Sequence, residues 1–377
     1  MGDVKTSLIK VNTQDLDRDT AEGEAQRKNI EYAGTVIKEG GLVAFPTETV
    51  YGLGGDAFNP DSSRRIYAAK GRPSDNPLIV HIYSKEQLPE ITEKVPEEAY
   101  ILADTFWPGP LTMVLNGNGR IPRETTGGLS TVAVRLPSDP VAKALIKAAG
   151  GFIAAPSANL SGRPSPTSAA HCMEDLDGRV DVVIDSGESI IGLESTIVDL
   201  TDGSGTVTLL RPGFITVEEL RKALQGKAKV LIDPAVAGVN TGKRTEDGEE
   251  CHPRAPGMKY RHYAPRGELT IVRGDSGRVA GEITRRLSEC AEKGLRTAVI
   301  ASGDTAASYR ADLIISIGES TRDEEGAAHG LFTALRRCDD ENCDVIFSEA
   351  FGDGESGVSL AVMNRLIKAS GGSVIDV

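Results

Sequence analysis

Two cations flank a glycine in the segment Lys70-Gly71-Arg72, and this pattern suggests binding chemistry. A lysine ammonium offers a point charge and an arginine guanidinium offers a fork of donors, a combination that suits phosphate oxygens. The same pattern fits the end of a helix, where Gly71 would be left-handed and the basic side chains would face the helix carboxyl end. The sequence leaves both interpretations open, a phosphate clamp and a helix cap.

A turn rich in hydroxyl and amide groups, APSANLSGRPSPT, spans residues 155–167. Ser157 and Asn159 follow the end of a short apolar stretch that we expect to be a buried strand. Turn chemistry alone can account for serine, asparagine and glycine at such a place. Hydrogen-bonding side chains beside a buried strand also suit the recognition of a nucleotide. Both explanations remain open at this point.

Two further polar residues lie inside apolar strand candidates. Arg135 interrupts TVAVRLP, and His81 is the fourth residue of LIVHI. An arginine on a solvent-facing side needs no partner, whereas one that points inward requires an anion such as a substrate carboxylate. His81 is either a satisfied core or surface histidine or a ligand-binding residue.

Several motifs that would identify a function are absent from the sequence. There is no GxxxxGK[ST] loop, no GxGxxG after the first strand, no nucleophile elbow and no HExxH. The glycine-rich segments 52–57 and 352–357 match none of these, and we interpret the second as a turn. The residues alone therefore predict only an α/β protein with a cationic, hydroxyl-lined pocket for a small anion.

Short apolar strands alternate with helical patterns through the first 225 residues, which favours an α/β domain. Segment 46–55 is predicted as a loop. From 226 to 267 the chain is polar, punctuated by Pro and Gly and without a period, as in an interdomain linker. From 268 strands and helices alternate again, which predicts a small doubly wound parallel sheet. We therefore expect an open-sheet domain at 1–225, a linker at 226–267 and a Rossmann-like α/β/α domain at 268–377. Because ligands of open α/β sheets bind beyond the strand ends, we expect the polar segments to converge there.

Composition restricts the classes of protein to consider. The 377 residues carry a formal net charge of −13, which argues against extended nucleic-acid binding because phosphate contacts supply most of that affinity. The N-terminal residues lack a secretory pattern, and no apolar run is long enough for a membrane span. The five cysteines form no CxxC pair, so we expect reduced thiols, no zinc site and a cytoplasmic location.

Taken together, the polar segments resemble the threonylcarbamoyl-AMP synthase family, in its long two-domain form known as Sua5. The segments FPTETVYGLG, KGRPSDNPL, APSANLSGRPSPT, GLESTIVD and LLRPG are similar to its YrdC-like catalytic domain. APGMKYRHYAP is similar to the linker of the long form. The order and spacing of six such segments make the resemblance specific, although each alone would be weak.

This resemblance implies an enzyme of the nucleotidyltransferase class. It would convert ATP, L-threonine and bicarbonate (or CO2) to threonylcarbamoyl-AMP and pyrophosphate, with Mg2+ held by the nucleotide phosphates and not by side chains. A separate transferase complex would then pass the threonylcarbamoyl group to the adenosine that follows the anticodon of tRNA. Threonine carbamate is already an anionic nucleophile, so its attack on phosphorus requires alignment and charge neutralisation more than a base.

The resemblance also assigns roles to residues. Lys70 and Arg72 correspond to catalytic residues at the triphosphate. Residues 255–265 would form a lid over the nucleotide. The expected ATP-binding residues are Arg72, Asn76, Thr131, Ser157, Asn159, Ser165, Arg211 and Tyr263. The expected threonine-binding residues are Thr49, His81, Arg135, Ala155 and Ser195, with Arg135 on the amino-acid carboxylate.

Two alternatives from other classes remain. A regulatory RNA-binding module would use the cationic pocket to grip phosphates, although the acidic net charge counts against it and no aromatic-rich sheet motif is present. An ATP-dependent carbamoyltransferase with another acceptor is the second alternative. Such enzymes can carry a similar domain, usually with acylphosphatase or zinc-finger segments that this sequence lacks.

Overall fold

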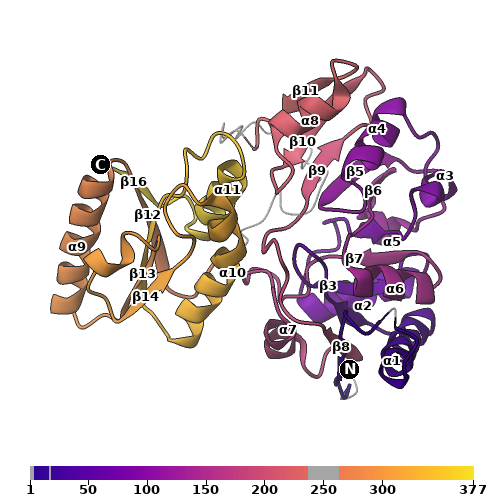
Figure 1. Cartoon of the computed structure of the whole chain (residues 1–377), viewed down its shortest axis with the longest axis horizontal. Coiled ribbons are helices and arrows are strands. Elements are labelled where there is room, and N and C mark those ends of the chain that lie inside the picture. Colours follow the sequence, from indigo (N-terminus) through magenta and orange to yellow (C-terminus); the bar gives the residue numbers. More distant parts are fainter. Residues whose placement is uncertain (1–3, 17, 237–262) are drawn as a thin grey trace. The chain divides into compact units, whose positions relative to one another are not determined.

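The structure is a computed structural model that describes residues 4–16, 18–236 and 263–377. The chain divides into two compact units (Figure 1). The first unit comprises Met1–Ser161, Pro166–Ser189 and Glu194–Lys259. The second comprises Tyr260–Val377 together with two short segments from earlier in the chain, Gly162–Ser165 and Ile190–Leu193. The units therefore do not follow one another simply along the sequence.

The first unit is built on an eleven-stranded mixed sheet with the order β1-β8-β2-β3-β7-β4-β6-β5-β9-β10-β11. Its strands are β1 (Ser7–Lys10), β2 (Val43–Phe45), β3 (Gly52–Asp56), β4 (Ile79–His81), β5 (Leu111–Asn116), β6 (Thr131–Arg135), β7 (Ile153–Ala155), β8 (Val182–Asp185), β9 (Thr196–Asp199), β10 (Thr206–Arg211) and β11 (Lys229–Ile232). Its α-helices are α1 (Ala21–Lys38), α2 (Pro60–Lys70), α3 (Leu88–Ile91), α4 (Glu97–Phe106), α5 (Arg123–Thr126), α6 (Pro140–Ala148), α7 (Ala169–Leu176) and α8 (Val217–Leu224).

Of the strands that the sequence did not predict, two lie in segments predicted as loop or linker. β3 begins inside segment 46–55, which was predicted as a loop, and β11 lies in the stretch predicted as linker. Glycine supplies much of β3, and glycine is a poor strand former, which hid this strand in the sequence. A Cβ on Gly54 would lie 2.8 Å from the Ile153 side chain and 3.0 Å from the Phe45 ring, so close packing requires glycine there.

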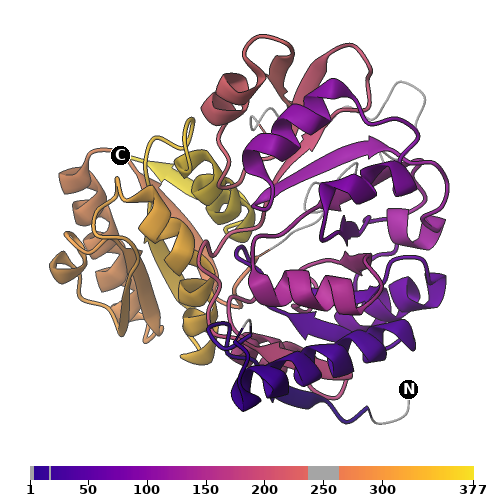
Figure 2. The ribbon, with the colours of Figure 1, turned by 45° about the vertical axis from the view of Figure 1, so that its right-hand side comes forward.

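Helices α1 and α6 cover one part of this sheet, and the ribbon shows them alongside each other (Figure 2). Their apolar side chains pack against β2, β7 and β8 in a core that includes Phe45, Ile153 and Val182. Ala155 belongs to the same core, and its cross-strand neighbour Ile79 belongs to a second apolar cluster on the central strands. Cross-strand neighbours point to the same face, so this face continues from the helix-covered strands onto β4, β6 and β5.

The second unit contains a five-stranded parallel sheet with the order β14-β13-β15-β12-β16, as the sequence predicted. Helix α9 covers one face, and α10 and α11 cover the other (Figure 1). The strands are β12 (Glu268–Arg273), β13 (Thr297–Ala301), β14 (Leu313–Ser316), β15 (Val345–Glu349) and β16 (Val374–Asp376). The helices are α9 (Ser276–Glu292), α10 (Glu324–Asp340) and α11 (Ser359–Ala369). Three-residue 3-10 turns lie at Lys85–Gln87 in the first unit and Ala306–Ser308 in the second.

Four of the five cysteines, Cys172, Cys290, Cys338 and Cys343, lie within the described residues, and all four are buried. The reduced thiols expected from their spacing stay a prediction. Among the residues that the structure describes, no helix is both long and apolar enough to span a bilayer.

Candidate active site

Strand register brings three polar residues into one row on the central strands. His81 of β4 and Thr112 of β5 each lie directly opposite Arg135 of β6. The next row on the same face is apolar and contains Ile79 and Ala133. We call the side of β4, β5 and β6 that carries these rows the site face. His81 is the last residue of β4 and Arg135 is the last residue of β6, so these side chains lie at strand ends, where the sequence predicted convergence.

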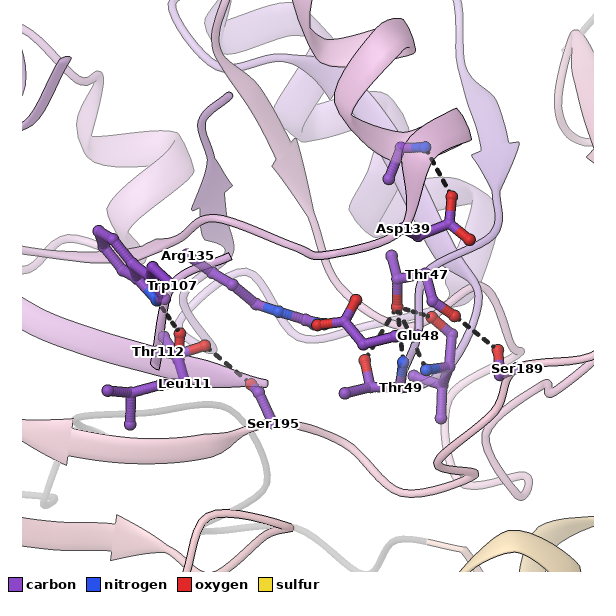
Figure 3. Close-up of polar contacts among 12 residues, drawn as sticks. Thr47, Glu48, Thr49, Trp107, Leu111, Thr112, Arg135, Asp139, Ser189 and Ser195 are labelled. Atoms are coloured by element: carbon purple, nitrogen blue, oxygen red, sulfur yellow. Dashed lines mark hydrogen bonds and ion pairs between the residues drawn. The ribbon is translucent and has the colours of Figure 1, made fainter. Parts of the chain in front are cut away.

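Arg135 points inward and pairs with Glu48 of the loop between β2 and β3 (Figure 3). The guanidinium Nη2 lies 2.8 Å from Glu48 Oε1, and the two side chains are only 5% and 7% exposed. The interpretation of Arg135 as an inward-facing cation is therefore confirmed. Glu48 was not selected from the sequence. The available signal was a lone acidic residue between two threonines in an otherwise uncharged, hydroxyl-rich segment.

Thr47 holds the loop that carries Glu48. Its hydroxyl donates to the Val50 carbonyl at 2.6 Å and accepts from the Thr49 amide at 3.2 Å. The Thr47 and Thr49 hydroxyl oxygens lie 2.9 Å apart, and Ser189 Oγ donates to the Thr47 carbonyl at 2.9 Å (Figure 3). The predicted residue Thr49 is thus buried beside Glu48 in a tightly hydrogen-bonded turn.

Ser195 connects Arg211 to the row of side chains that contains Arg135. Arg211 donates from Nε to the Ser195 carbonyl at 3.0 Å and from Nη2 to the Ser195 hydroxyl at 3.1 Å. The same hydroxyl lies 2.8 Å from Thr112 Oγ1, which faces the Arg135 row (Figure 3). Arg211, Ser195 and Arg135 are therefore brought together. Thr112 was missed because nothing distinguishes a threonine in a strand by sequence.

Burial keeps His81 neutral. Desolvation, reinforced by the nearby positive charge of Arg135, lowers the pKa of His81 to about 3. Its Nδ1 donates to the Ile79 carbonyl at 3.1 Å, and its ring meets Phe45 edge-on at a centroid distance of 6.0 Å. His81 is therefore an uncharged imidazole at the site face. Such a group can offer a hydrogen bond without adding charge.

Of the two sequence interpretations of the Lys70 segment, the structure tests the helix cap, and the phosphate clamp stays a prediction. Asn59 caps the start of α2, and Gly71 ends the helix in a left-handed conformation with φ of 62°, so the cap prediction is confirmed. Lys70 itself is 2% exposed, and its ammonium donates to the backbone carbonyls of Ser157 and Asn159. The Ser157 hydroxyl donates to Asn159 Oδ1 at 2.6 Å. Lys70, Ser157 and Asn159 thus form one cluster.

Arg72 and Asn76 lie at the entrance to β4. Arg72 donates from Nε to the Asn76 carbonyl at 3.3 Å and from Nη2 to the Pro77 carbonyl at 3.1 Å. The Asn76 side chain is buried, and its Oδ1 has no hydrogen-bond partner among the described residues. A buried amide oxygen of this kind favours a ligand that donates a hydrogen bond.

One predicted ATP-binding residue, Thr131, lies apart from Arg135 on the same strand. Thr131 begins β6, whereas Arg135 ends it, which separates them by roughly 13 Å along the strand. Ser165 and Tyr263 belong to the second unit, so their predicted contacts with ATP stay predictions. Tyr263 is buried with φ of 65°, and its ring lies 5.1 Å from that of Phe332. Most of the predicted lid, 255–262, lies outside the described residues.

Comparisons with known proteins match both units. A family model described as "Telomere recombination" matches residues 35–213, and one described as "Threonylcarbamoyl-AMP synthase, C-terminal domain" matches residues 215–371. A threonylcarbamoyl-AMP synthase of Pyrococcus abyssi is 48% identical over 92% of this chain and 96% of its own. One of Bacillus subtilis is 45% identical over 92% and 94%.

A solved structure gives the same result. The crystal structure of P. abyssi Sua5 complexed with L-threonine is 46% identical, covers 98% of this chain and 99% of its own, and superposes with a TM-score of 0.86. Its fold agrees with the α/β architecture expected from the sequence. With these matches across both units, the chain belongs to the threonylcarbamoyl-AMP synthase family.

Proposed function

We propose that this protein joins L-threonine and bicarbonate to AMP, with release of pyrophosphate from ATP. The observation that carries the proposal is the buried Arg135 guanidinium on the site face, which is ion-paired with Glu48 but has buried donors without hydrogen-bond partners among the described residues. Thr112, in the same row, lies 2.8 Å from the Ser195 hydroxyl, which in turn accepts from a second cation, Arg211. Unused guanidinium donors near hydroxyls suit a small hydroxylated amino acid, whose carboxylate can accept from them. The family membership supports the same substrate.

At the threonine end, Arg135 would hold the substrate carboxylate. Thr49 and Ser195 would meet the side-chain hydroxyl, and His81 would add a neutral hydrogen-bonding group, with backbone near Ala155 closing the site. A site whose buried groups hydrogen-bond a substrate hydroxyl strongly disfavours analogues without it, because those groups are then left unpaired.

At the nucleotide end, Lys70 and Arg72 would neutralise the triphosphate and the charge that develops at the α-phosphorus. Asn76, Ser157, Asn159 and Arg211 would orient the nucleotide, and Thr131, Ser165 and Tyr263 are the further expected contacts. A carbamate oxygen then attacks the α-phosphorus, an oxygen–phosphorus bond forms, and pyrophosphate leaves. This is nucleotidyl transfer, which depends on alignment and electrostatics.

In this proposal Mg2+ would accompany the nucleotide. Within residues 4–16, 18–236 and 263–377, no cluster of three or more His, Cys, Asp or Glu side chains is arranged to hold a metal ion. Lys70 and Arg72 would hold the phosphates, which in turn would hold the ion. When bound, Mg2+ would supply further neutralisation of the triphosphate charge.

The product is a mixed anhydride that water destroys, so its use requires a nearby acceptor enzyme. We propose that a tRNA threonylcarbamoyltransferase complex receives it in the cytoplasm, which makes this reaction the first step of threonylcarbamoyladenosine formation at the adenosine following the anticodon.

Pyrophosphate release tests the proposal directly. The purified protein is incubated with ATP, Mg2+, bicarbonate and each standard amino acid in turn, and the adenylate product is identified by mass spectrometry. We expect release that depends on both threonine and bicarbonate. Dependence on a different amino acid would replace the substrate, and tight, steeply salt-dependent binding of tRNA without turnover would favour the RNA-binding alternative.

A further inference from the structure

The Glu48–Arg135 pair has an unusual geometry for a buried ion pair. A carboxylate that merely anchors an arginine commonly makes two parallel hydrogen bonds to the guanidinium fork. Here Arg135 Nη2 and Glu48 Oε1 lie 2.8 Å apart, yet the N–H groups of the guanidinium are not aligned for a hydrogen bond to the carboxylate. Among the described residues, Glu48 Oε1 and Oε2 and Arg135 Nε and Nη2 all lack hydrogen-bond partners while buried.

Four unsatisfied charged atoms in one place are costly, because removing charges from water requires hydrogen bonds to compensate. The two sides of the pair have opposite needs. Arg135 offers donors to an anion, and Glu48 offers acceptors to a cation. A free amino acid is a zwitterion that carries both groups on neighbouring carbon atoms. It therefore supplies the missing partner for each side.

The residues around Glu48 leave its carboxylate oxygens able to accept hydrogen bonds from a ligand. The neighbouring threonine hydroxyls of Thr47 and Thr49 interact with each other and with the turn, not with the Glu48 carboxylate. Two further ionisable groups of the described residues interact electrostatically with the pair, His81 on β4 and Asp139 at the start of α6. Burial first, and the Glu48 charge in addition, raise the pKa of Asp139 to about 6. Burial and Arg135 hold His81 neutral.

We propose that the Glu48 carboxylate binds the ammonium group of the amino-acid substrate and accepts the proton that this group must lose before it can react. The inference rests on the proposed function, in which that nitrogen is carboxylated. The ammonium nitrogen passes one proton to a Glu48 oxygen and becomes a neutral amine. The amine attacks the carbon of bicarbonate, a nitrogen–carbon bond forms, and the carbon–hydroxyl bond breaks. A second nitrogen proton leaves with the hydroxyl as water, and the product is the carbamate anion.

This assignment gives Glu48 and Arg135 complementary tasks. Arg135 fixes the carboxylate end of the substrate, and Glu48 fixes and deprotonates the nitrogen end. The Thr47 hydrogen bonds and the Ser189 contact hold the loop so that Glu48 faces Arg135 (Figure 3). An amino acid without a free ammonium group would leave the buried Glu48 oxygens without the hydrogen-bond donor that the ammonium supplies.

The test compares the wild type with Glu48→Gln, which keeps the shape and removes the charge. Pyrophosphate release is measured from pH 6.5 to 9.5 with saturating ATP, Mg2+ and bicarbonate. At pH 7 we expect kcat/KM for threonine to fall about 10²–10³-fold, the range of a lost proton acceptor. The deficit should shrink toward high pH, because the fraction of threonine with a neutral amine rises about tenfold per pH unit below the amine pKa.

A binding measurement on the wild type supports the test if the variant folds poorly. Calorimetry compares threonine with 2,3-dihydroxybutanoate, which carries a hydroxyl in place of the ammonium group. We expect the wild type to prefer threonine about 30-fold or more, the usual effect of leaving a buried charge unpaired. Glu48→Gln should lose this preference, and Glu48→Asp, which retains the charge on a shorter side chain, should keep part of it.

The ways in which the test can fail are distinguishable. If the wild type releases no pyrophosphate with threonine, the proposed function fails. If the wild type is active but Glu48→Gln is impaired equally at every pH and still prefers threonine, Glu48 only positions Arg135 and the inference is wrong. Equal wild-type affinity for the two ligands would also overturn it.

Discussion

At the scale of single residues, buried charge dominates this protein. The Lys70 and Arg135 side chains are both buried from solvent, and the cost of burying their charge is offset in different ways. Lys70 donates to the carbonyls of Ser157 and Asn159, which ties helix α2 to the turn after β7. Arg135 has donors left over, which is the property expected of a group that binds substrate.

Replacing Lys70 by Ala should lower kcat for pyrophosphate release by roughly 10²–10³, because one preorganised positive charge is lost from the triphosphate. The measurement is initial rate at saturating ATP and threonine. The control is Lys38→Ala, which removes one positive charge from the exposed last residue of α1 and should leave kcat unchanged. Turnover of Lys70→Ala within twofold of wild type would remove Lys70 from the active site.

At the scale of elements, the pairing of strands β4 and β6 determines which side chains meet on the site face and how His81 is protonated. Parallel pairing sets His81 beside Arg135, and burial in the sheet prevents the imidazole from taking a proton. The unfolded chain has no such restriction. Folding is therefore linked to pH through this one strand pair.

His81 should make the protein acid-sensitive. Its pKa is about 3 in the folded state, against 6.5 for the ordinary imidazole, so the unfolded state gains a proton first as the pH falls. The stability from His81 is complete above about pH 6.5 and is lost progressively toward pH 3. Between pH 7 and pH 5 we expect it to account for a loss of about 2 kcal/mol in the free energy of unfolding. Urea denaturation of wild type and His81→Asn at both pH values measures this difference, and an equal loss in the two proteins would contradict it.

Asp139 provides a control, because its effect on the free energy of unfolding changes with pH in the opposite direction. Its folded pKa of about 6 lies above its ordinary 3.8, so the folded state holds the proton longer and stability falls as the pH rises from about 4 to 6. Asparagine also caps helices well, so Asp139→Asn should keep the bond from the Ala142 amide. This variant should be more stable than wild type at pH 7.5, and that advantage should vanish near pH 4.

At the scale of the whole molecule, the division into units does not follow the order of the chain. Segments Gly162–Ser165 and Ile190–Leu193 belong to the second unit. Arg336 of α10 is fully buried and donates to the Pro164 carbonyl at 2.7 Å, and His329 Nδ1 lies 2.9 Å from the Ile190 carbonyl. A truncated chain that ends before residue 260 would therefore leave these two segments without their packing partners.

Arg336→Ala should destabilise the second unit by about 3 kcal/mol, because it removes a buried side chain and leaves the Pro164 carbonyl without this donor. The measurement is the free energy of unfolding in urea. Arg337→Ala provides the matched control, since Arg337 is the exposed neighbour on the same helix and should change stability by less than about 0.5 kcal/mol. Equal effects of the two substitutions would contradict the structural role of Arg336.

The sequence by itself determined what depends on local order along the chain. Gly71 marked the end of α2 because capping chemistry is local, and the alternation after residue 268 predicted the parallel sheet. Tertiary structure alone decided which side chains meet. Glu48 and Arg135 are far apart in the sequence, and β3 is a strand only because Phe45 and Ile153 pack onto its glycines. Strand register and close packing create such pairs, and neither leaves a periodic signal in the residues themselves.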